Sequence, residues 1–176
     1  MSPIHHCTDL VIGVVLTCVS RYSEHEAERS VVVMQWNVLS QALGTSLDNF
    51  VSASSSLDWE SRRWRVVHEI IRHSPDIICL QEVDHYRLLE RILTSLGYQG
   101  RFVAKPDSPC LYVEDNNGPD GCALFYRTEK FVCERVEVRG HCISYMLYIL
   151  YNTTLFRVAC CPCGEWTVTR WRWRSA

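Results

Sequence analysis

The sequence has no excess of positive charge. Its 18 Lys and Arg residues are outnumbered by 20 Asp and Glu residues, so the formal net charge at pH 7 is −2. A general positive field that would attract nucleic acid is therefore excluded, because binding to a phosphate backbone depends on clustered basic side chains. Any contact with RNA has to rely on a few local residues.

The first thirty residues do not have the pattern expected of a signal peptide or a membrane-spanning helix. The apolar residues 10–19 are fewer than the roughly 20 that a helix needs to cross a bilayer, and Asp9 precedes them with no Lys or Arg before it. Residues 1–29 contain too many acids for a mitochondrial import signal. We expect no membrane partner and a cytoplasmic location, with mitochondria as the alternative.

The ten cysteines do not indicate a disulfide framework. Cys79 and Cys122 lie inside apolar, strand-like runs, where a small buried thiol packs well, and a reducing compartment is favoured. With 47% hydrophobic and 22% charged residues, the 176 residues fit one globular domain. We divide the chain into a variable leader at 1–29, expected to be mobile, a folded region at 30–139 and a tail at 140–176.

Apolar runs along the folded region predict buried strands that end in polar residues. The expected strands lie at residues 31–34, 77–80, 102–103, 122–126 and 131–138. Residues 105–121, rich in proline, glycine and asparagine, are expected to form a long loop. In the tail, residues 143–151 and 155–158 are also strand-like.

Two amphipathic segments between these strands predict helices. The first follows Asp58, a good N-cap residue, and stops at Ser74, before a proline. The second follows Asp84 as its cap and ends at Gly97, which tolerates the left-handed conformation. Gly121 is expected to allow a sharp turn into the next strand. The alternation of strands and helices predicts an α+β fold with strands layered against helices.

Two polar side chains follow apolar strands and suit a hard cation. Asn37 offers an amide oxygen and Glu82 a carboxylate, and loops at strand ends gather at one edge of a sheet. One carboxylate and one amide oxygen make a partial shell for Mg²⁺, which keeps several waters and shares its site with substrate phosphates. From spacing alone, a turn asparagine and a surface glutamate are the ordinary alternatives.

The local sequence around these residues resembles a known superfamily. MQWNVLSQALG at residues 34–44 and ICLQEVDHY at 78–86 resemble the first two motifs of the endonuclease/exonuclease/phosphatase superfamily. Residues 105–126, KPDSPCLYVEDNNGPDGCALFY, resemble its nocturnin-like, deadenylase-like branch. The resemblance covers about residues 31–138 and implies the amino-terminal half of a four-layer α/β/β/α fold, a partial β-sandwich with flanking helices. The tail does not share it.

The resemblance implies a Mg²⁺-dependent phosphoesterase whose substrate is the 2′-phosphate of NADP(H), poly(A) RNA or both. Carried over to this chain, Asn37 and Glu82 are the catalytic and metal-binding residues, and Lys105 and Asn117 bind substrate phosphate. A compact ammonium suits a phosphate, and a cation stabilises the charge that develops as water attacks. Without the resemblance, Lys105 reads as an exposed loop lysine and Asn117 as part of an asparagine turn.

Downstream groups that the resemblance requires are missing from the sequence. The family uses an Asp-x-Asn pair and a closing Asp-His pair, yet no aspartate follows Glu137 and the one later histidine is His141. We expect a truncated chain that is weakly active or inactive, because losing a group that activates the nucleophile costs orders of magnitude in rate. The alternative is a non-catalytic isoform that binds partners or nucleotides. Half a sandwich should also expose one apolar sheet face.

Several other residues have less specific patterns. His85 is expected to pack at the start of a helix rather than act as a base. Trp36, Trp59 and Trp64 could stack on adenine but are expected to be core residues. The terminal Cys142, Cys160, Cys161 and Cys163 leave a zinc-binding module as a third alternative. The sequence does not indicate an oligomeric state.

Overall fold

The computed structural model describes the backbone of residues 15–19, 31–46, 57–139, 144–151, 154–160 and 166–172, and the side chains of residues 31–44 and 57–133. Its helices are α1 (Gln41–Ser46), α3 (Trp59–His73), α4 (Tyr86–Ser95) and the 3-10 helix η1 (Pro109–Tyr112). Its strands are β1 (Val15–Val19), β2 (Val31–Asn37), β3 (Ile77–Val83), β4 (Tyr98–Ala104), β5 (Gly121–Arg127), β6 (Val132–Arg139), β7 (Ser144–Tyr151), β8 (Thr154–Cys160) and β9 (Trp166–Arg172).

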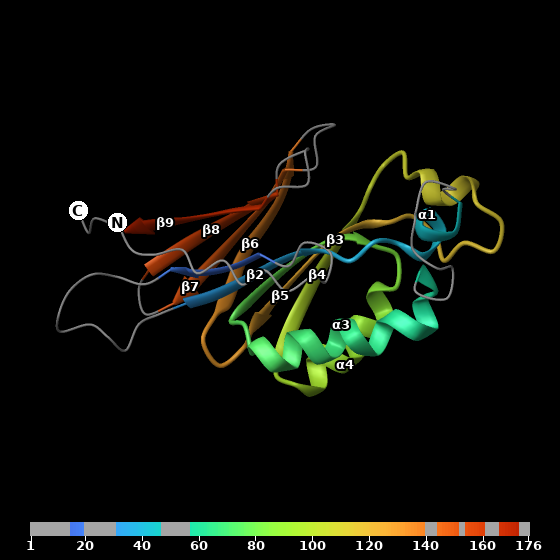
Figure 1. Ribbon diagram of the computed structural model, residues 1–176. Coiled ribbons are helices and arrows are strands. Elements are labelled where there is room, and N and C mark those ends of the chain that lie inside the picture. The colour runs from blue at the N-terminus through green and yellow to red at the C-terminus, as the bar shows by residue number, and fades with distance from the viewer. Residues whose placement is uncertain are drawn as a thin grey trace.

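The described strands form two sheets (Figure 1). The first has the order β1-β2-β3-β5-β4, in which β2 and β3 run parallel and the other neighbours antiparallel. The second has the order β6-β7-β8-β9 and is antiparallel throughout. Residues 15–19, in the segment assigned as the leader, thus form β1 and pair with β2. The tail contributes β7, β8 and β9, and of these only β9 was not expected from the sequence pattern. The α+β class is confirmed.

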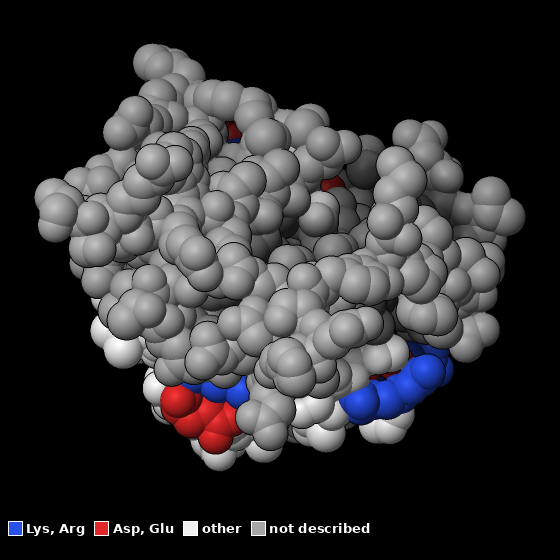
Figure 2. All heavy atoms as spheres, turned by 90° about the vertical axis from the view of Figure 1, so that its left-hand side faces the viewer, with Lys and Arg blue, Asp and Glu red and all other residues white. Residues whose placement is uncertain are grey.

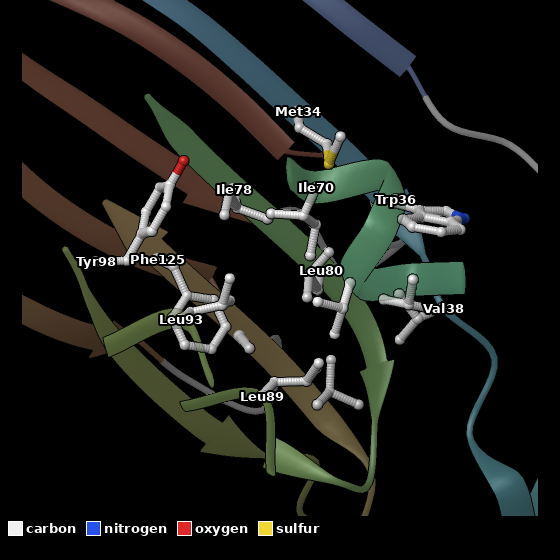
Figure 3. Packing of buried hydrophobic residues seen from close by; sticks show 14 of the residues in the cluster. Met34, Trp36, Val38, Ile70, Ile78, Leu80, Leu89, Leu93, Tyr98 and Phe125 are labelled. Carbon is white, nitrogen blue, oxygen red and sulfur yellow. The ribbon is translucent and has the colours of Figure 1, made fainter. Parts of the chain in front are cut away.

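Helices α3 and α4 cover one face of the first sheet (Figures 1 and 3). Ile70 of α3 and Leu89 of α4 lie over Leu80 of β3 and Phe125 of β5, and all four side chains are at most 1% exposed. Removing each such side chain from water contributes about 1.5–3 kcal/mol. The helical spacing of the apolar residues therefore decides which face of each helix packs against the sheet.

The opposite face of the first sheet is also buried. Val33, Ile77, Leu124 and Tyr126 are at most 5% exposed and form a second core cluster, which Phe131 joins just before β6. For the first sheet, the expectation that half a sandwich leaves one apolar face exposed is therefore wrong. The second sheet, which continues from β6, lies on that side in Figure 1.

The helix ends agree with three of the four expected signals. Asp58 caps α3 through its carboxylate, Ser74 ends α3 with φ 46°, and Gly97 follows α4 with φ 84°. The prediction that Asp84 caps α4 is wrong: His85 occupies that position and forms no side-chain cap. The Asp84 carboxylate instead binds backbone N–H groups at the start of α1.

The described part of the chain contains no helix long and apolar enough to cross a membrane. Of the cysteines whose side chains are described, Cys79, Cys110 and Cys133 are free thiols. Burial raises the pKa of the Cys79 thiol well above its ordinary value, because the thiolate would be desolvated in the core. Cys79 therefore packs as a small apolar side chain.

Gly121 is required for a different reason from the one expected. Its φ is not positive, and it pairs within β5, opposite Ala104 of β4. A Cβ atom at this position would lie 2.2 Å from the carbonyl oxygen of Val103 and 2.8 Å from the ring of Phe102. The strands approach too closely here for any side chain, and backbone atoms cannot move aside easily.

Gly121→Ala should therefore lower the free energy of unfolding by roughly 2 kcal/mol, within the range for overpacked sites. Gly44→Ala is the matched control, because a Cβ at Gly44 meets its nearest neighbour at 3.5 Å and alanine favours a helix by up to about 1 kcal/mol. Urea unfolding of both variants measures the difference. Equal stability of Gly121→Ala and the native chain would contradict the close approach.

Candidate active site

The site lies at one edge of the first sheet. Because β2 and β3 are parallel, their carboxyl ends meet there. Val83 of β3 pairs with Gly121 at the start of β5, and Gly121 pairs with Ala104 at the end of β4. The loop of residues 105–120 therefore leaves and re-enters the sheet at the same edge. In Figure 1 this is the end of the sheet that carries α1.

A β-bulge directs Glu82 at this edge. The register between β3 and β5 shifts between Leu80 and Val83, and Glu82 has φ 53°. Side chains alternate between the faces of a regular strand, so an unbulged Glu82 would share the helix-covered face of Leu80. Positive φ in a non-glycine residue costs of order 1–3 kcal/mol and is concentrated at functional sites. Bulges likewise re-aim side chains beside active sites.

Asn37 is the direct partner of Glu82. The Asn37 Nδ2 donates a hydrogen bond to Glu82 Oε1 at 2.7 Å, and Leu39 N donates to Asn37 Oδ1 at 3.0 Å. Leu39 itself has φ 56°, which marks a tight turn after β2. The structure thus brings together the two residues that the sequence singled out. Because the amide oxygen accepts from the Leu39 turn, Asn37 orients Glu82 in this geometry, and its role as a metal ligand stays a prediction.

Lys105 and Asn117 both lie in the loop at the same edge. Lys105 follows β4, its backbone N–H donates to Asp120 O at 2.8 Å, and its side chain is exposed and forms no ion pair with a described residue. Asn117 Nδ2 lies 3.2 Å from His85 Nε2. Its neighbour Asn116 forms the turn, with Nδ2 bound to Val113 O and Oδ1 to Gly118 N. Neither Lys105 nor Asn117 is hydrogen bonded to the Asn37–Glu82 pair among the described residues.

A buried polar cluster anchors this loop. Ser108 Oγ donates to Asp120 Oδ1, and the Cys110 thiol lies 3.6 Å from the same oxygen. The Ser40 hydroxyl, in the turn after β2, contacts Cys110 Sγ at 3.3 Å. All four side chains are at most 3% exposed. The sequence analysis did not find this cluster, because residues separated by up to 70 positions share no local pattern.

His85 packs beside the site, as expected. Its ring stacks on Trp59 with centroids 4.5 Å apart and an interplanar angle of 2°, and its Nε2 lies 3.8 Å from Asp84 Oδ1. Trp36 and Trp59 are core residues, at 4% and 5% exposure. The same prediction is wrong for Trp64, which is 56% exposed on the outer face of α3.

The described residues fit Mg²⁺ only as a partial site. They contain no group of three or more His, Cys, Asp or Glu side chains that could hold a metal ion. Glu82 supplies a hard carboxylate at the loop edge, whereas the Asp84 carboxylate is used by the start of α1. One carboxylate is compatible with Mg²⁺, which keeps waters and binds substrate phosphates. The cysteines of the zinc alternative lie outside the described side chains.

The comparisons with known proteins establish the class of protein. The model of the Endonuclease/Exonuclease/phosphatase family matches residues 34–175. The chain therefore belongs to this family, whose members are hydrolytic nucleases and phosphatases. The match includes most of the tail at 140–176, which had been expected not to resemble the family.

Within the family, the chain is similar to nocturnin, which confirms the resemblance inferred from its motifs. It is 51% identical to Drosophila melanogaster nocturnin over 108 residues, 61% of this chain and 17% of that protein. It matches the solved human nocturnin catalytic domain with bound sulfate at TM-score 0.55 and 38% identity, over 80% of this chain and 48% of that one. It also matches the solved structure of ANGEL2, a 2′,3′-cyclic phosphatase, in complex with adenosine-2′,3′-vanadate. The TM-score is 0.54 and the identity 26%, over 78% of this chain and 39% of that one. The chain thus spans under a third of the curated nocturnins and about half of the solved domain.

Burial lowers the pKa of His85 below its ordinary value of 6.5, the charge of Arg62 lowers it further, and Asp84 acts in the opposite direction. As pH falls below 6.5, the unfolded chain takes up a proton that the folded imidazole does not, so the free energy of unfolding should fall. NMR titration of the His85 ring should give a midpoint below 6.5, and Asp84→Asn should lower that midpoint further. A midpoint at or above 6.5 would contradict the buried stack.

Proposed function

We propose that this chain carries the glutamate-bearing part of a Mg²⁺-dependent phosphoesterase site. The supporting observation is the bulge that turns Glu82 toward Asn37, at 2.7 Å, on the loop edge of the sheet. A strained, hydrogen-bonded carboxylate at the end of parallel strands is expected where a cation and a phosphate meet.

Each residue has a defined task in this proposal. Glu82 holds the cation, and Asn37 fixes the direction of its carboxylate through Nδ2. Lys105, exposed at the same edge, neutralises a substrate phosphate, and Asn117 lines the approach from the loop. Bound Mg²⁺ supplies charge stabilisation for the phosphoryl oxygens as water attacks. Nucleophile activation is assigned to none of the described residues.

The proposed substrates are NADP(H), through its 2′-phosphate, and poly(A) RNA. Similarity to nocturnin and to ANGEL2 with its adenosine-2′,3′-vanadate supports a phosphorylated adenine nucleotide. The net charge of −2 favours a small nucleotide over a long polyanion. Figure 2 views the end of the molecule away from α1, where the described basic and acidic atoms in view lie near one another along the lower edge.

The alternative is a non-catalytic, truncated isoform that binds the metal or nucleotide without turnover. It is favoured by the single carboxylate that the described residues place at the site, since no group of three potential metal-binding side chains occurs among them. We retain the cytoplasm as the proposed location, with mitochondria as the alternative. The oligomeric state is not part of the proposal.

Glu82→Gln should weaken binding of Mn²⁺, used as a probe for Mg²⁺, at least tenfold, because it removes the charge but keeps an oxygen that can accept from Asn37. Glu129→Gln is the matched control. Glu129 is 70% exposed and follows the far end of β5, so its replacement should change the affinity less than twofold. Electron paramagnetic resonance of free Mn²⁺ measures both variants.

The same samples are assayed for phosphate release from NADP⁺ and for shortening of an oligo(A) RNA. Turnover that requires Mg²⁺ and disappears in Glu82→Gln supports the hydrolase. Metal binding without turnover supports the non-catalytic alternative. Mn²⁺ affinity that is equal in the native chain and Glu82→Gln would refute the site itself.

A further inference from the structure

The turn that carries Asn37 is held by residues outside the candidate pair. Val38 follows Asn37, and its N–H donates to Gln81 O at 3.1 Å. The carbonyl oxygen of the same Val38 accepts from Arg62 Nη1 at 2.7 Å. One peptide segment is thus tied to β3 on one side and to α3 on the other, directly after the residue that orients Glu82.

Arg62 ties this turn to the start of α3. Its Nε donates to Leu57 O at 2.7 Å, and its guanidinium lies 5.5 Å from the ring centroid of Trp59. Its Nη2 is buried and has no hydrogen-bond partner among the described residues. A buried guanidinium nitrogen without a partner lowers stability, so only the two bonds to carbonyl oxygens are strong contacts of this side chain. Two charge-assisted bonds to carbonyl oxygens need the planar, forked geometry of arginine, which lysine lacks.

Asp84 holds the other end of the turn. Its Oδ2 accepts from Gln41 N at 2.7 Å and from Ala42 N at 3.4 Å, and its side chain is 3% exposed. Gln41 in turn accepts the backbone N–H of Trp59 through Oε1. The turn is therefore attached at Val38, to Gln81 and Arg62, and at Gln41, to Asp84. Gln81 and Asp84 lie within two positions of Glu82 in the sequence.

We propose that Arg62 and Asp84 are positioning residues that set the geometry of the Asn37–Glu82 pair, Arg62 through Val38 and Asp84 through the start of α1. This inference rests on the proposed function in one respect: its expected effect on the affinity for a divalent cation requires that Glu82 binds one. The hydrogen bond between Asn37 and Glu82 can be observed without any metal, so the two ideas can be tested separately. Leu39, with φ 56°, adopts a conformation that is uncommon for a non-glycine residue and lies between these two attachments.

The test uses the full chain and the variants Arg62→Gln and Arg62→Lys, with Arg65→Gln as the matched control. Arg65 is on the same helix and exposed, and its side chain forms no hydrogen bond or ion pair with a described residue. Two quantities are measured: the Mn²⁺ dissociation constant of the folded protein, and the ¹⁵N–¹H signals of the Asn37 side-chain amide in metal-free protein. Outer partners of a metal ligand typically change affinity 10–100-fold.

Arg62→Gln should raise the Mn²⁺ dissociation constant about tenfold and shift the Asn37 amide signals toward those of a solvated asparagine, by analogy with other outer partners. Arg62→Lys, which keeps the charge but cannot bond both carbonyl oxygens, should have an intermediate effect, and it decides the question if Arg62→Gln does not fold. Arg65→Gln should leave both quantities unchanged.

If Arg62 has a purely structural role, the melting temperature of Arg62→Gln falls, but the Asn37 signals and the Mn²⁺ affinity of the folded protein stay at native values. That result would overturn the proposal. If the native chain binds no Mn²⁺ but the Asn37 signals still move in Arg62→Gln, the proposed function fails and the positioning role stands. Asp84→Asn should shift the Asn37 signals less than Arg62→Gln, because an amide oxygen can still accept from Gln41 N.

Discussion

The parallel pairing of β2 with β3 is the constraint on which the candidate site depends. It places Asn37 directly opposite Gln81, so the two residues share a sheet face. Glu82 comes one residue later and in a regular strand would point to the other face. The bulge after Leu80 and the positive φ of Glu82 remove this mismatch, which is why the amide and the carboxylate can bond at 2.7 Å.

The strain at Glu82 has to be held by packing on both sides of the sheet. Leu80 and Val83, which bracket the bulge, are at most 1% exposed, so the strand cannot slip by one residue without exposing them. The second core cluster closes the other face, where Ile77 and Cys79 are fully buried. A backbone strain of order 1–3 kcal/mol is small beside the burial of these side chains. The sandwich therefore stabilises the unfavourable conformation that aims the glutamate.

The sequence was informative where one local signal determines one local structure. Apolar runs located β2 and β3, and Asp58 and Gly97 marked helix ends correctly. The meeting of Asn37 with Glu82 was inferred from strand ends and family motifs, although the residues are 45 positions apart. The bulge could not be inferred, since QEV in a strand has no distinctive composition. Asp84 was misassigned for a related reason: it precedes a helix in sequence but is nearer in space to the start of α1.

Tertiary context also explains the remaining differences. Trp64 has the spacing of a core residue on α3, yet the sheet is already covered by Trp59, Val67 and Ile70, which leaves Trp64 56% exposed. Sequence periodicity identifies a stripe of a helix but not where the covered stripe stops. The first sheet does not expose the apolar face that was expected of half a sandwich, because β6 to β9 form a second sheet that the expectation did not include.

Binding a cation and turning over a substrate depend on different parts of such a site. Holding and aiming a carboxylate requires the β2–β3 pair, the bulge and the turn attached by Arg62, and all of these lie within the described residues. Activating water requires further groups that complete the charge balance in the transition state. A chain that covers 48% of the solved nocturnin domain can therefore retain the first property independently of the second. Family membership follows from the fold and motifs, whereas activity has to be argued from the complete set of groups around the phosphate.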